Sequence, residues 1–430
     1  MAPVPISDEV KQVIQIFVDI LLPTEPMKLL YRKFQKVCDS CCTFSTCNSS
    51  VIDIANIKDR SFSLAASGSA DDNNTRVSFG MFFNSLFRPG IEALKRVKDS
   101  GHYDSETQPE IDQLVKYITE NKIASYCYKT GDAKKSGRPT GDNEDLAKIG
   151  EANEKLRFCD VKNKCYEYDL KCVLLTHLLK KLIPDCSIAV MTDEMESIGK
   201  TMRNPHAENE FLCSCGCGGR IFTDKTSIGH QEVFHGRVDA IIGKTAIQMT
   251  LEVPDPDDEG VDEDTAFEFK KGTILNVDTI EQGAATAVVF SFLKAKEKGH
   301  FIVAYNEKQR LKCYLTPTIL ISESKYIIMF YDAVNDLFLA SNEEIFWHQT
   351  LRIKDFFYLW LALNYEKTMM TVYGTDTCEK VNYLRSGFHE KTCNLDKYYE
   401  VEYGVEFKEP MSNLTEIFMN PISDIISVLH

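Results

Sequence analysis

The sequence has no long uncharged apolar run and no export signal. Its longest apolar stretches, such as FFYLWLALNY at 356–365, fall well short of the roughly 20 residues that a helix needs to cross a bilayer. The stretch 1–22 lacks a basic lead followed by an apolar core and a small-residue cleavage site. We therefore expect a soluble intracellular protein, nuclear or cytoplasmic, with no membrane partner.

Net positive charge is also absent. Lysine and arginine number 49 against 64 acidic residues, which leaves a formal net charge of −15. A strongly acidic chain repels nucleic acid at long range, so a function on nucleic acid requires a local basic surface or bound cations. Seven of the acids lie in one stretch, DPDDEGVDED at 255–264. Without that stretch the chain carries −8, which weakens the objection without removing it.

The cysteines do not suggest a disulfide framework. There are 15 of them, an odd number in a long chain without an export signal, which favours reduced thiols. Two clusters have spacings that a structural zinc ion could use: CDSCCTFSTC at 38–47, and CSCGCGGR at 213–220, which has His206 and His230 near it in the chain. Buried thiols without a metal are the alternative at both clusters.

What is present is the composition of a globular protein, with 43% apolar and 26% charged residues. Helical periodicity predicts two helices within 8–37, one on each side of a Pro-containing break, and further helices at 107–122, 145–158 and 168–182. The polar, Gly-rich stretch KTGDAKKSGRPTGDNED at 129–145 is the best domain boundary.

From 185 to 340 the pattern changes to short β-branched and aromatic runs, which predict strands interrupted by one helix at 279–297. After this part we expect a helix, a loop and one or two short strands. The expected division is a mainly helical N-terminal region with a Cys-rich loop at 1–160, a core at 161–345, and a C-terminal helical extension at 346–430.

The stretch FEFKKG at 267–272 carries the most information about function. If FEFK is a strand, its strict alternation places Glu268 and Lys270 on one face. A metal-dependent phosphodiesterase needs such a pair, because the acid holds a divalent cation and the ammonium orients or polarises the attacking water. Acid-x-Lys recurs elsewhere, including a second EFK at 406–408. The predicted elements on each side of Glu268 and Lys270 must therefore distinguish this pair from the other Acid-x-Lys pairs.

The context upstream is a predicted hairpin. HGRVDAIIG puts Gly236 three residues before Asp239, at the start of an apolar run that turns into TAIQMTLEV at 245–253. Downstream, Thr279 is expected to cap the helix that contains Gln282, and HFIVAY at 300–305 predicts a further strand.

This order of elements resembles the core of the PD-(D/E)XK nuclease superfamily: a strand with Asp, a turn, a strand with Glu-x-Lys, a helix with Gln, and a strand. It is most similar to the RecB and lambda-exonuclease type, in which GxxD, (D/E)xK and QxxxY recur, and it covers roughly 190–335. It also resembles a group of eukaryotic proteins that share HGxxD, an acidic insert, ExK and VFSFL. The resemblance implies an α+β fold with a restriction-endonuclease-like mixed sheet flanked by helices, between a helical N-terminal region and a C-terminal helical tail.

The resemblance also implies roles for individual residues. Asp239 and Glu268 would be ligands of Mg²⁺ or Mn²⁺, Lys270 the catalytic lysine, and Gln282 a helix residue that supports the site. An acid from the preceding helix would complete it, for which Glu196 is the choice and Glu194 the alternative.

Three residues leave alternatives open. Asp255, in the literal Pro-Asp pair of the sequence, competes with Asp239 for the ligand role. Thr286 stands where the helix motif QxxxY has Tyr. His235 is either part of the site or a histidine whose hydrogen bonds are satisfied at the end of a strand.

The expected function is metal-dependent phosphodiester hydrolysis of nucleic acid, DNA rather than RNA. The alternative is a catalytically silent scaffold of the same fold that serves protein interaction or zinc binding. Net charge favours the alternative, and the intact Asp, Glu and Lys oppose it. No Gly-rich phosphate loop ending in Lys-Ser or Lys-Thr and no cysteine-protease signature is present, so neither of these enzyme classes is supported.

Overall fold

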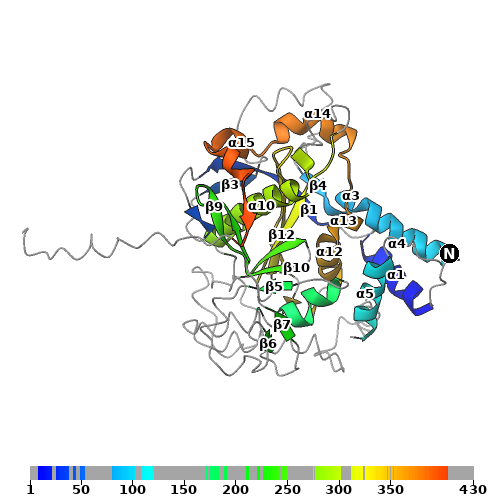
Figure 1. Ribbon diagram of the computed structural model, residues 1–430. Coiled ribbons are helices and arrows are strands. Elements are labelled where there is room, and N and C mark those ends of the chain that lie inside the picture. The colour runs from blue at the N-terminus through cyan, green and yellow to red at the C-terminus, as the bar shows by residue number, and fades with distance from the viewer. Residues whose placement is uncertain are drawn as a thin grey trace, which may run out of the picture.

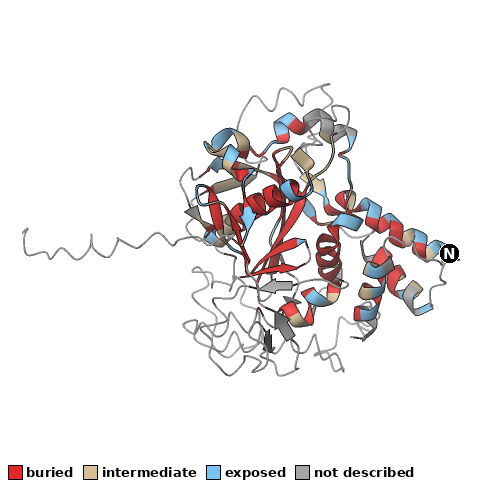
Figure 2. Cartoon of the chain, in the orientation of Figure 1, coloured by how far each residue is buried: buried red, intermediate tan, exposed pale blue. Residues whose placement is uncertain are grey.

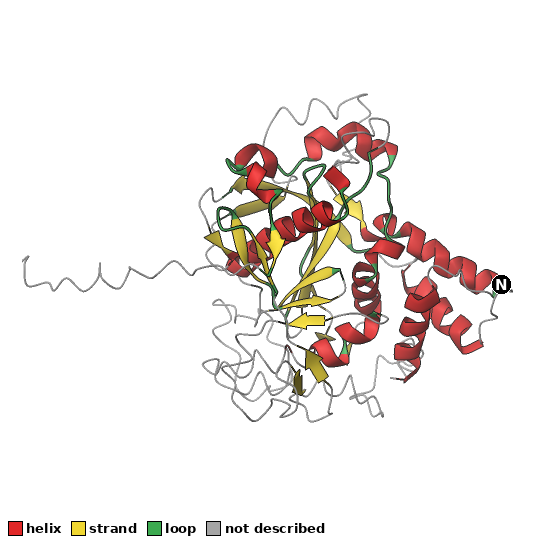
Figure 3. Cartoon of the chain, viewed as in Figure 1, coloured by secondary structure: helices red, strands yellow, loops and turns green. Residues whose placement is uncertain are grey.

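A mixed β-sheet forms the centre of the protein, as the computed structural model shows in Figures 1 and 3. The described residues are 8–21, 26–37, 42–44, 49–53, 80–101, 108–120, 171, 174–183, 188–190, 210–212, 220–222, 226–242, 244–249, 275, 277–301, 311–322, 325–345, 347–348, 350–351 and 353–404.

The strands of this sheet come from distant parts of the chain. In spatial order they are β3 (Ser50–Asp53), β1 (Lys28–Lys36), β14 (Leu337–Ser341), β13 (Lys325–Asp332), β12 (Thr316–Ile321), β11 (Thr245–Met249), β10 (Ala240–Ile242) and β5 (Ile188–Val190). Beside this path, β4 (Gly80–Phe82) pairs with β1 and β15 (Glu344–Ile345) with β13. Among these described pairs only β11 and β12 run parallel. The sheet is therefore mixed and mostly antiparallel.

The parallel pair requires a crossover, because a short turn cannot return the chain in the same direction. Helix α10 (Val277–Glu297) lies between β11 and β12 in the chain and packs on both. Every residue from Gly283 to Ala295 is buried, as Figure 2 shows by its red ribbon. A helix that is apolar on all sides must be covered on all sides. Here α10 is packed between the central sheet and a second, smaller sheet.

The smaller sheet joins the C-terminal part of the described chain to its middle. Its order is β18 (Glu402–Tyr403), β8 (Ser227–Gly229), β9 (Phe234–Arg237) and β2 (Cys42–Thr43). Two further pairs of short strands are β6 (Glu210–Leu212) with β7 (Arg220–Phe222), and β16 (Trp347–His348) with β17 (Thr350–Leu351).

Helices cover the other face of the central sheet. They are α1 (Asp8–Leu21), α3 (Phe83–Leu86), α4 (Arg88–Ser100), α5 (Gln108–Glu120), α12 (Ile353–Leu363) and α13 (Tyr365–Thr368), together with the 3-10 turn η3 (Leu179–Leu182). The remaining helices are α14 (Thr375–Leu384), α15 (Phe388–Lys391) and α16 (Leu395–Tyr398). No described helix combines the length and apolar character that a membrane span requires.

Strand β13 shows why the sheet has a core on each face. Its side chains alternate, as the pleat of a strand dictates. Ile328 and Phe330 belong to the core that contains α1 and α12, whereas Met329 and Tyr331 belong to the core that contains α10. All eight residues of the strand are buried, as expected where both faces of a sheet are covered.

Several predicted elements are confirmed, and others are wrong. The structure has helices at α1, α5 and α10 and strands at β10, β11, β12 and β13, as the sequence predicts. The cap predicted at Thr279 is wrong, because α10 begins two residues earlier, at Val277. The second helix expected within 8–37 is strand β1 instead. Pairing with β14 and β3 on its two sides outweighs the local preference. His300 and Phe301, where a strand was expected to begin, are helical.

Strand β1 also bears on the organisation of the chain. Together with β3 and β4 it belongs to the sheet that holds β11 to β14. Segments of the expected N-terminal region thus pair with segments of the expected core. The boundaries at 160 and 345 stay predictions.

Candidate functional site

Asp239 directly precedes β10, and the predicted hairpin follows it. Strands β10 and β11 pair antiparallel, with Ala240 opposite Ile247 and Ile242 opposite Thr245. The apolar run after Asp239 forms the first strand because its β-branched residues suit a sheet covered on both faces. The hairpin places Asp239 at the open end of β10, away from the turn.

The carboxylate of Asp239 is buried and bonded through both oxygens. Lys171 Nζ lies 2.6 Å from Oδ1, and the backbone N–H of Met249 donates to Oδ2 at 2.6 Å. Asp239 is 4% exposed and Lys171 5%. A buried charge is tolerated only when it is paired and hydrogen-bonded, and here an ammonium and a backbone amide fulfil both conditions.

Gln248 adds a third polar side chain. Gln248 belongs to β11 and directly precedes Met249, whose N–H donates to Asp239. Gln248 is 6% exposed, and its Oε1 atom has no hydrogen-bond partner. A buried acceptor without a donor is costly and uncommon. We call Lys171, Asp239 and Gln248 the Asp239 cluster.

Sequence reasoning identified Asp239 and missed the other two members of this cluster. Lys171 belongs to the helical pattern at 168–182, where residues 171 and 174–177 are helical. A lysine in such a pattern usually faces water. The signal for Gln248 was available, because it is the polar residue within the otherwise apolar strand run AIQM.

Most of the other predicted site residues lie outside the described part of the chain. These are Glu268, Lys270 and Glu196, together with the alternatives Glu194 and Asp255. Their roles stay predictions.

Gln282 and His235 are described. Gln282 is partly buried on α10, and the next residue, Gly283, lies against Met329 of β13. The role predicted for Gln282 stays open. His235 is buried on β9, and its Nδ1 lies 2.8 Å from the carbonyl oxygen of Val233. This contact agrees with a histidine satisfied at a strand end.

The donor set can be compared with what a divalent cation needs. Within the described ranges, no three His, Cys, Asp or Glu side chains converge on one point. Mg²⁺ does not need three, since it keeps several waters and binds one or two carboxylates. Asp239 offers one carboxylate and Gln248 an amide oxygen, both hard donors. The described residues therefore fit part of a magnesium or manganese site.

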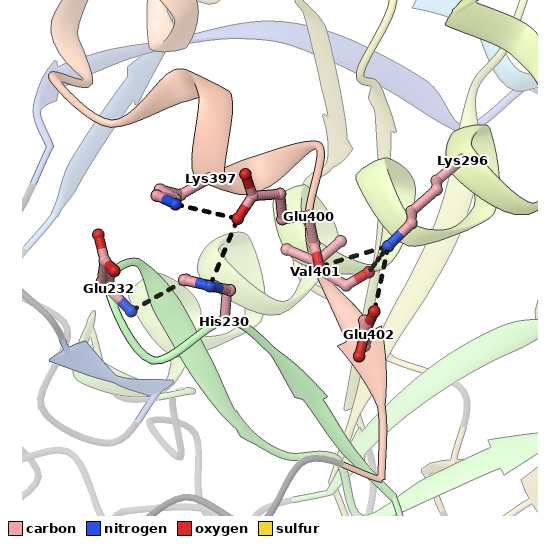
Figure 4. Close-up of polar contacts among 7 residues, drawn as sticks. All are labelled: His230, Glu232, Lys296, Lys397, Glu400, Val401 and Glu402. Atoms are coloured by element: carbon pink, nitrogen blue, oxygen red, sulfur yellow. Dashed lines mark hydrogen bonds and ion pairs between the residues drawn. The ribbon is translucent and has the colours of Figure 1, made fainter.

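The cysteine clusters are almost entirely outside the described part of the chain; Cys42, in β2, is within it. His230, which is near the second cluster in the chain, is described and faces a carboxylate. Its Nε2 lies 3.7 Å from Glu400 Oε2, and its Nδ1 accepts a hydrogen bond from the backbone N–H of Glu232 at 3.2 Å. The proton of the neutral ring is therefore on Nε2, which points to Glu400 (Figure 4).

The same surface fastens the last described strand. Lys296, on α10, donates to the carbonyl oxygen of Val401 at 3.0 Å and lies 3.6 Å from Glu402 Oε1. Lys397 donates to Glu400 at 3.0 Å. Figure 4 shows these contacts around the start of β18, which pairs with β8. Exposed pairs of this kind contribute little each, so we assign the group a role in holding β18.

No protein-family model, curated protein or solved structure matches the chain. The fold and the site define an α+β protein with a mixed, mostly antiparallel sheet and a buried carboxylate–ammonium–amide cluster at one of its hairpins.

Proposed function

We propose that this protein hydrolyses phosphodiester bonds in nucleic acid, with Mg²⁺ or Mn²⁺ bound at a restriction-endonuclease-like site. The observation that carries the proposal is the position of Asp239. It is a buried carboxylate at the open end of the β10–β11 hairpin, and the helix α10 and a strand parallel to β11 follow. The motif resemblance predicts a strand with Asp, a turn, a strand with Glu-x-Lys, a helix and a further strand, and the Glu-x-Lys stretch lies outside the described residues. The resemblance also favours DNA over RNA.

Asp239 and Glu268 would hold the cation, and the amide oxygen of Gln248 would be a further ligand. A bound divalent cation lowers the pKa of a coordinated water and stabilises charge on the phosphate. In this proposal Lys270 orients the water, Gln282 supports the site from α10, and Glu196 adds an acid. Bound cations would also offset the field of a chain with a net charge of −15.

A second function is supported by Lys171. Its ammonium already neutralises Asp239, and both groups are removed from water. A carboxylate that is satisfied in this way does not require a metal ion. The fold would then be a catalytically silent scaffold for protein interaction or zinc binding.

The test is a cleavage assay with labelled DNA and RNA, each with and without Mn²⁺. Under the nuclease proposal, DNA cleavage requires the metal. Lys270→Ala reduces its rate by about 10²–10⁴-fold, the usual range for a group that assists proton transfer. Glu268→Gln also reduces the rate, because it removes a charged ligand of the cation. Glu406→Gln is the matched control, since it alters the second EFK at 406–408.

Two outcomes would reject the nuclease proposal. A protein that cleaves neither substrate at any metal concentration is the silent scaffold. Cleavage that persists at full rate in both site variants comes from a contaminant. For the scaffold, elemental analysis of the purified protein measures whether zinc is bound.

A further inference from the structure

Lys171 occupies the place where a cation would neutralise Asp239. Its Nζ is 2.6 Å from Oδ1, and the pair is buried. A second cation brought to the same oxygen would meet the ammonium at short range in a site with little water, where repulsion between like charges is strong. The ammonium and a metal ion therefore compete for this carboxylate.

The neighbouring amide points to a ligand that differs from lysine. An ammonium has three N–H donors, yet Oε1 of Gln248, the residue before Met249, receives no hydrogen bond. The ion pair thus leaves one buried acceptor unused. A divalent cation would use it, since Mg²⁺ and Mn²⁺ bind several oxygen ligands at once.

We propose that Lys171 is a built-in counter-ion that a divalent cation must displace, so that the Asp239 cluster exchanges an ammonium for a metal ion. With the ammonium displaced, Asp239 and Gln248 are the two oxygen ligands that the cluster supplies. The proposal rests on the metal site of the proposed function and adds its regulation. The flexible four-carbon stem of lysine allows its head group to change partners without unfolding the helix.

Exchange has a measurable consequence for affinity. The apparent affinity of a metal equals its intrinsic affinity multiplied by the fraction of molecules in which the carboxylate is free. If the ion pair is formed in nine molecules out of ten, the apparent dissociation constant is raised about tenfold. Removing the ammonium should restore the intrinsic affinity.

The experiment is a titration of the full-length protein with Mn²⁺, with free Mn²⁺ followed by electron paramagnetic resonance. We expect Lys171→Met to bind Mn²⁺ at least about tenfold more tightly than the original protein. Adding Asp239→Asn to this variant should abolish the gain, and adding Gln248→Leu should reduce it. Lys171→Arg, which keeps the positive charge, should bind as weakly as the original protein.

Lys244→Met is the matched control. This lysine is on the same hairpin, and it pairs with Glu366 at the surface, away from Asp239. Its removal should leave Mn²⁺ affinity unchanged.

Two results would overturn the exchange. One is a Lys171→Met variant that binds Mn²⁺ no more tightly than the original protein. The other is a gain that survives Asp239→Asn. If Lys171→Met alone is unstable, its thermal unfolding is measured with and without Mn²⁺, because a ligand of the folded state raises the midpoint. Recovery by Mn²⁺ supports the exchange, and no recovery overturns it.

These results are separable from those of the cleavage assay. Tighter Mn²⁺ binding by Lys171→Met without any cleavage of nucleic acid would support the exchange and reject the nuclease. Cleavage that depends on Mn²⁺ and Asp239, with unchanged Mn²⁺ affinity in Lys171→Met, would support the nuclease and reject the exchange.

Discussion

The ammonium of Lys171 and the carboxylate of Asp239 form a buried ion pair, with Nζ 2.6 Å from Oδ1. The pair joins a helical segment to the open end of a β-hairpin. It stabilises the fold only while both partners are present, because either charge alone would be left uncompensated in the interior.

The first prediction concerns the energy of this ion pair. Lys171→Met and Asp239→Leu should each lower the free energy of unfolding by about 3–5 kcal/mol, since each leaves one charge buried and unpaired. The double variant should lose much less than the sum of the two, because it leaves no charge behind. Chemical denaturation of all four proteins measures the coupling. Additive losses would mean that the two groups do not stabilise each other.

The second prediction compares two buried hydroxyls on α10. Ser291 Oγ donates to the carbonyl oxygen of Tyr331 at 2.7 Å and accepts from the N–H of Ala333 at 3.1 Å. Thr286 Oγ1 is buried and has no hydrogen-bond partner. Ser291→Ala should cost about 1–3 kcal/mol, because it leaves two backbone groups unsatisfied. Thr286→Val should be neutral or stabilising. Equal effects in denaturant unfolding would contradict this difference.

The third prediction concerns two glycines. Gly229 has φ +123°, and a Cβ there would lie 2.5 Å from the carbonyl oxygen of Phe234. Gly229→Ala should therefore lower the free energy of unfolding by at least about 1–3 kcal/mol. A Cβ at Gly374 would meet nothing within 4 Å. Gly374→Ala should therefore change the free energy of unfolding by no more than about 1 kcal/mol. Thermal and chemical unfolding check both values, and a well-tolerated Gly229→Ala would show that the β8–β9 pairing can shift.

The fourth prediction is a pH dependence at His300. Burial, assisted by the charge of Lys298, lowers the pKa of His300 from 6.5 to about 4. Below pH 6.5 the unfolded chain takes up a proton that the folded protein does not. The contribution of His300 is therefore fully present above pH 6.5 and is lost as the pH falls to about 4.

The variant His300→Phe tests this pH dependence, because its side chain cannot take up a proton. This variant keeps an aromatic ring beside Tyr314, which the imidazole contacts with ring centroids 4.4 Å apart. The free energy of unfolding of His300→Phe minus that of the original protein should increase as the pH is lowered from 7.5 to 4.5. A difference that stays constant over this range would show that His300 titrates alike in the folded and unfolded states.

Local patterns were sufficient for elements whose partners are close in the chain or whose periodicity is strong. Strand β13 alternates between two apolar faces, α10 is a long apolar helix, and the β10–β11 hairpin follows from two apolar runs and a short turn. They failed for β1, whose residues locally favour a helix. Its pairing with β14, formed about 300 residues later in the chain, decides for the strand.

The site shows the same division. The GxxD spacing of the resembled family points to Asp239, and the polar Gln248 stands out within its apolar strand. No local pattern connects Lys171 to Asp239, because the contact depends on how a helical segment packs against the end of the hairpin.

The sequence by itself determined the hairpin and the acid at its open end, because turn residues and the two-residue period of a strand act over a few positions. Only the tertiary structure decided what this acid contacts. It buried Asp239, placed Lys171 against one oxygen and the N–H of Met249 against the other, and left the amide oxygen of Gln248 unpaired. These contacts join segments that chain order leaves apart, and packing of the whole sheet and its helices selects them.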